Sequence, residues 1–137
     1  MALIIIPALF LGLIIGIYEA VLLHRDVAVP SHRFGHMLHA LVYAVIAVFA
    51  TMNIAFVAQS LTFLPAFLQK PIVLQAAIGV ITMIKIHGSS AAIRGSIGGG
   101  SVGMKETWVH SLVISGLVVA APYLWIVLGP MMPSWLR

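Results

Sequence analysis

EAVLLHRDVAVPSHRFGHMLH, residues 19–39, is the stretch around which this chain of 137 residues is organised. It closes one long apolar segment, opens the next, and carries two of the three acidic residues and four of the six histidines. Hydrophobic residues form 62% of the chain and charged residues only 7%, whereas charged residues form about a quarter of a soluble domain. The sequence therefore predicts a single integral membrane domain over residues 1–137.

Four apolar segments predict an all-α fold, a four-helix transmembrane bundle with short connections. A helix needs about 20 apolar residues to cross a hydrocarbon core of ~30 Å. Around Pro65 we expect a helix end or a short interfacial helix with Phe63 and Phe67, and Pro71 suits the first turn of the next helix. The glycine-rich residues from His87 to Lys105 are expected to lack regular structure. The expected spans are about 2–23, 34–58, 71–87 and 106–128.

The first expected helix has one face that should point into the bundle. At about 100° per residue, Gly12, Gly16 and Glu19 fall within roughly 60° of one another. Small residues let a neighbouring backbone approach closely, and a carboxylate avoids lipid. Polar stripes follow on the next two helices, formed by His36, His39, Tyr43 and Asn53 and then by Gln75, Thr82 and Lys85.

The basic residues predict an orientation in the membrane. Five of the seven lie in or beside the first and third connections, and cytoplasmic connections are enriched in Lys and Arg. Connections 24–33 and 88–105 are therefore predicted to be cytoplasmic, with both termini outside. This arrangement brings all six histidines and all three acidic residues to one membrane end.

A first hypothesis for this polar end is a metal or haem site. His36 and His39 are three residues apart, Glu106 and His110 are four apart, and Glu19 completes the set. Such pairs present their side chains to one point, and imidazole with carboxylate suits a transition metal, while two imidazoles suit haem. The sequence has no dedicated motif such as H-E-x-x-H. The alternative is that the histidines bond only to water and lipid headgroups.

Glu19 itself has two interpretations. It can form a salt bridge to Arg25, Lys85 or Lys105 that joins helix ends. Packed instead against histidines, which exchange protons near neutral pH, it would suit a small proton-coupled transporter that acts as an oligomer.

The function favoured by the sequence is that of a non-catalytic or accessory subunit of a larger membrane assembly, or a homo-oligomer. The expected partners are the lipid bilayer and other membrane subunits, because so small a chain has little room for a substrate domain and its spans are apolar on most faces. The basic residues are scattered rather than clustered, which argues against nucleic acid, and the lack of cysteine excludes thiolate metal sites.

Overall fold

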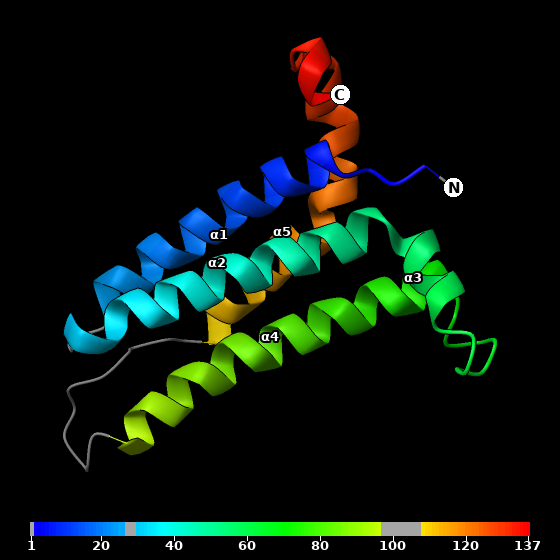
Figure 1. The fold of residues 1–137 in the computed structure, drawn as a ribbon. Coiled ribbons are helices and arrows are strands. Elements are labelled where there is room, and N and C mark those ends of the chain that lie inside the picture. The colour runs from blue at the N-terminus through cyan, green and yellow to red at the C-terminus, as the bar shows by residue number, and fades with distance from the viewer. Residues whose placement is uncertain (1, 27–29, 97–107) are drawn as a thin grey trace.

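A computed structural model describes residues 2–26, 30–96 and 108–137, with the side chains of 22–26, 30–34, 36 and 89–96 left out of the description. The described residues form helices and turns without a strand, so the all-α prediction is confirmed (Figure 1). Five α-helices are followed by two short 3-10 helices. Their bounds are α1 Ile6–Asp26, α2 Pro30–Met52, α3 Ile54–Ser60, α4 Pro71–Ser96, α5 Trp108–Leu128, η1 Gly129–Met131 and η2 Ser134–Leu136.

Three long helices lie side by side, and the fourth crosses them. Figure 1 shows α1, α2 and α4 running roughly along one another, with α5 crossing behind α1 and α2 toward the C-terminus. The most extensive contact is between α1 and α2, and α5 touches α1, α2 and α4. The C-terminal ends of α1 and α4 lie on the same side of the molecule as the N-terminal end of α2.

The helices provide fewer clear membrane spans than the four expected. Residues Pro71–Gly88 and Trp108–Met131 are long and apolar enough to cross a bilayer. A third candidate combines Met37–Met52 with Ile54–Ser60, but these two helices meet at an angle of 88°. The apolar part of α1, Ile6–Val21, is shorter than a full span. The described residues thus support a membrane protein with two or three spans, and a four-span bundle is not confirmed.

The predicted span 34–58 breaks at Asn53, which separates α2 from α3. The buried side chain of Asn53 donates to the carbonyls of Phe49 (2.9 Å) and Ile4 (3.1 Å) and accepts from the amide of Ile4 (2.7 Å). Asparagine side chains of this kind compete with the helix for backbone groups. Asn53 thereby fixes the segment before α1 to the end of α2, at the place where the helix turns.

Replacing Asn53 by leucine is expected to free this segment. Three hydrogen bonds are lost, and the amide and carbonyl of Ile4 lose their partner, at a cost of about 2 kcal/mol. Hydrogen exchange at the Ile4 amide should become faster. Ser60→Ala is the matched control, because the Ser60 hydroxyl donates to the carbonyl of Phe56 within its own helix. Equal exchange rates in the two variants would contradict this role of Asn53.

The region before α4 agrees with one of the two expectations for it, whereas α4 itself is longer than expected. The helix α3 ends at Ser60, residues 61–70 form turns with Phe63 and Phe67 exposed, and α4 begins at Pro71 as predicted. The helix continues to Ser96, whereas irregular structure was predicted from His87. Residues 91–94 are good helix formers, and an isolated glycine such as Gly88 costs only about 1 kcal/mol in a helix. Lys85 therefore lies well inside α4 instead of near its end.

The core is built by close helix contacts, as the shared face of Gly12 and Gly16 predicted. A Cβ atom at Gly12 would lie 2.8 Å from the Cα of Val45, and one at Gly16 would lie 3.0 Å from the Cα of Leu41. The helix α5 is tied to α2 and α4 by polar side chains inside the bundle. Thr51 donates to the carbonyl of Val118 (3.0 Å), and Gln75 donates to the carbonyl of Val119 (2.9 Å).

Candidate functional site

Lys85 is the centre of a cluster that joins three helices inside the bundle. Its Nζ lies 2.6 Å from Nε2 of His39 and 3.9 Å from the ring centroid of Tyr43. The carboxylate of Glu19 attracts the same ammonium electrostatically. We call these four residues the Lys85 cluster. It connects α1 through Glu19, α2 through His39 and Tyr43, and α4 through Lys85.

The helical spacing explains how each side chain reaches the cluster. Glu19 follows Gly16 by three residues, so it shares the face that packs on α2, and only 3% of it is exposed. His39 and Tyr43 are four residues apart and therefore adjacent on α2. The Tyr43 hydroxyl also lies 3.5 Å from that of Thr82, one turn before Lys85 on α4. The polar stripes predicted for α2 and α4 therefore face each other.

The contact between Lys85 and His39 fixes the roles of the two nitrogens. With Lys85 as an ammonium group, which can only donate hydrogen bonds, Nε2 of His39 is assigned as the acceptor and the ring proton to Nδ1. The face of Tyr43 adds a cation–π contact of about 0.5–2 kcal/mol. A lone cation at membrane depth costs several kcal/mol, so the surrounding acceptor, ring and carboxylate lower the cost of placing Lys85 in this helix.

A second contact links α4 to the start of α5. The rings of His87 and Trp108 stack with centroids 3.7 Å apart and an interplanar angle of 13°. Nδ1 of His87 is buried, and no described residue forms a hydrogen bond with it. Nε2 of His110, half a turn beyond Trp108, is buried as well. Aromatic stacking therefore fixes the start of α5 against α4.

The predicted metal-site residues are only partly brought together. Glu19 and His39 both belong to the Lys85 cluster, and His110 lies near the stacked pair at the start of α5. The side chain of His36 and the whole of Glu106 lie outside the described residues. Among the side chains that the structure does describe, no three His, Asp or Glu residues are grouped to hold a metal ion. The metal and haem hypothesis stays a prediction, and Nε2 of His39 is already engaged by Lys85.

The sequence predicted a site at the histidines rather than at Lys85, the central residue of the cluster. Lys85 appeared as one of three salt-bridge partners for Glu19, and the structure places it within electrostatic reach of that carboxylate. Tyr43 was predicted only as part of a polar stripe on its helix. The signal available in the sequence was the i, i+4 spacing of His39 and Tyr43. It places a hydrogen-bond acceptor and an aromatic ring side by side, where both can contact the ammonium of a lysine on another helix.

The arrangement accommodates the ammonium group of Lys85 inside the bundle and joins helices. In comparisons with known proteins, no family model, no curated protein and no solved structure matches this chain. A function for this chain is therefore inferred from the geometry of the described residues alone.

Proposed function

We propose that this chain is a non-catalytic subunit of a membrane assembly, either with further copies of itself or with other membrane chains. In the proposal, the Lys85 cluster joins α1, α2 and α4 within the subunit, and the outward face of α5 contacts the neighbouring subunit. In each of the two clear span candidates, only 28% of the residues are buried inside the chain. Most of their surface is therefore available to lipid or to another helix.

The observation that carries the proposal is Gly116. Gly12, Gly16 and Gly79 each lie against a neighbouring helix, with an added Cβ meeting an atom within 3.0 Å. Gly116 lies in the middle of the apolar helix α5, is exposed, and has no atom within 4 Å of an added Cβ. Together with Ala120, four residues later, it forms a small-xxx-small pair.

Such a pair favours helix association because it lets two backbones approach closely. The large side chains around it on the outer face of α5 are exposed and apolar, and they provide the rest of a contact surface. They include Val109, Leu112, Val113 and Val127.

Gly116→Ile is expected to dissociate the assembly. The added side chain keeps a neighbouring helix away, and we expect about a tenfold weaker association, equivalent to ~1.4 kcal/mol. Native mass spectrometry of chain purified from membranes in mild detergent reports the stoichiometry and any co-purified chains. Gly88→Ile is the matched control, since Gly88 is also an exposed helical glycine with open space around it. A wild-type chain that purifies as a clean, stable monomer would overturn the proposal.

A further inference from the structure

The loop of residues 61–70, between α3 and α4, holds two phenylalanine rings outside the protein. Phe63 is 78% exposed and Phe67 is 62% exposed. The side chain of Gln69 crosses the loop, and its amide nitrogen donates to the carbonyl of Leu64 (2.5 Å). The loop is therefore folded by its own hydrogen bonds, with both rings left outside.

The helix before this loop turns away from the direction of the bundle. Figure 1 shows α2 and α4 running roughly along one another, and α4 contains the span candidate Pro71–Gly88, so both helices take the same direction through a bilayer. The segments Met37–Met52 and Ile54–Ser60 meet at 88°, which places α3 close to the membrane plane. No residue of α3 is buried. We call residues 54–70, which comprise α3 and the loop, the surface segment.

The position of the loop in the chain sets its depth. It ends directly before Pro71, the first residue of the span candidate. Irregular backbone that faces lipid is not found inside the hydrocarbon, whereas exposed phenyl rings are unfavourable in water. The boundary between headgroups and acyl chains meets both requirements, and aromatic rings are enriched there. Lys70 is exposed at the same place, where an ammonium group is attracted to lipid phosphates.

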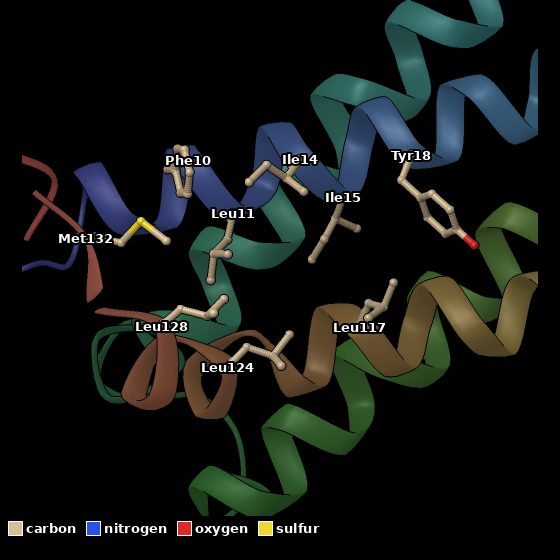
Figure 2. Close-up of a pocket in the computed structure, with 9 residues that line it drawn as sticks. All are labelled: Phe10, Leu11, Ile14, Ile15, Tyr18, Leu117, Leu124, Leu128 and Met132. Carbon is tan, nitrogen blue, oxygen red and sulfur yellow. The ribbon is translucent and has the colours of Figure 1, made fainter. Parts of the chain in front are cut away.

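The composition of the loop differs from that of an apolar surface deeper in the molecule. A hollow of about 380 Å³ between α1 and α5 is lined only by apolar and aromatic residues, among them Leu117, Leu124 and Leu128 (Figure 2). The loop instead exposes Thr62 and Lys70 together with its two rings. A mixture of polar and aromatic side chains is typical of the membrane interface.

The exposed area favours lipid over a second protein as the partner of the loop. With roughly 200 Å² for a phenylalanine side chain, the two rings expose on the order of 300 Å². A stable protein interface buries ~800 Å² on each partner. The bilayer requires no such area, because the spans already hold the chain in the membrane.

We propose that the surface segment rests on the bilayer surface, with the rings of Phe63 and Phe67 inserted below the lipid phosphates and Lys70 at the level of the phosphates. In this arrangement α2 crosses the membrane once, and α3 runs along the surface instead of continuing the span. The proposal is independent of the subunit contact proposed for α5.

The test measures the depth of nitroxide spin labels in the full chain, which contains no native cysteine. Phe63→Cys, Phe67→Cys and Lys70→Cys are labelled one at a time in vesicles of phosphatidylcholine and phosphatidylglycerol. Electron paramagnetic resonance compares collisions with oxygen, which concentrates in hydrocarbon, and with a water-soluble nickel chelate present on both sides. Labels at positions 63 and 67 should lie about 5–10 Å below the phosphates. The label at position 70 should lie at the phosphates and collide with nickel.

Val80→Cys is the matched control, because Val80 is half exposed in the middle of the span candidate and should lie ~15 Å deep, near the bilayer centre. Ala66→Cys is exposed and leaves both rings in place, so its label should also report the boundary. If nickel collisions exceeded oxygen collisions at positions 63, 66 and 67, the loop would lie in water and the proposal would be wrong. A depth equal to that of Val80 would overturn it as well, because the loop would then re-enter the membrane. Labels shielded from both reagents, with spin–spin broadening that disappears on dilution with unlabelled chain, would overturn it in favour of a second copy.

Discussion

Lys85→Met is expected to destabilise the fold by about 2–3 kcal/mol, because it removes the charged donor to His39 and the cation over the ring of Tyr43. It also removes the ammonium that the buried carboxylate of Glu19 attracts electrostatically. Methionine keeps the length and apolar stem of lysine, so the change is mainly electrostatic. The measurement is the free energy of unfolding in mixed micelles with a rising fraction of denaturing detergent, followed by circular dichroism.

Two further variants identify the cause of this loss. Lys70→Met is the matched control, since Lys70 is exposed just before α4, and it should stay within about 0.5 kcal/mol of wild type. The double variant Glu19→Gln/Lys85→Met should recover a large part of the lost stability, because the buried carboxylate is then neutral as well. The coupling free energy between the two sites should be about 1–3 kcal/mol. Strictly additive effects would mean that Glu19 and Lys85 do not interact.

Gly12→Leu is expected to have a comparably large effect, by forcing α1 and α2 apart. The added Cβ would meet the Cα of Val45 at 2.8 Å, and a backbone atom cannot rotate out of the way as a side chain does. Overpacking of this kind costs about 1–3 kcal/mol, and the longer leucine side chain places the expected loss near 3 kcal/mol. The most extensive helix contact in the chain would be disrupted.

The same unfolding measurement checks this expectation. Gly35→Leu on α2 is the control, because no atom lies within 4 Å of its added Cβ. That variant should be neutral or slightly stabilised, since leucine favours a helix by about 0.8 kcal/mol over glycine. If Gly12→Leu were as stable as Gly35→Leu, the close approach of α1 and α2 at Gly12 would be wrong.

The start of α4 and the inward face of α1 could be predicted from local physical chemistry. Proline is favoured at the first position of a helix, which placed the start of α4 at Pro71 correctly. The angular spacing of Gly12, Gly16 and Glu19 correctly predicted the face of α1 that packs inside the bundle. Each of these two predictions rests on the position of particular residues within a single helix. The sequence alone therefore contains the signal.

The remaining features depend on tertiary contacts that no local pattern encodes. The break at Asn53 requires the backbone of Ile4, which lies 49 residues earlier in the chain. The central place of Lys85 depends on how α4 faces α2, and α4 itself continues past the position where glycine and serine predicted its end. The hollow between α1 and α5 arises from the crossing of two helices that are far apart in sequence.

The meeting of α1, α2 and α4 at Lys85 is the central structural claim, and the nitrogen atoms of His39 test it most directly. Solid-state NMR of histidine- and lysine-labelled chain in bilayers, with His39→Gln to assign the signals, reports the protonation of each ring nitrogen. The structure predicts that Nε2 of His39 lacks a proton and gives a through-space cross-peak to Nζ of Lys85. A protonated Nε2 without that cross-peak would contradict the account.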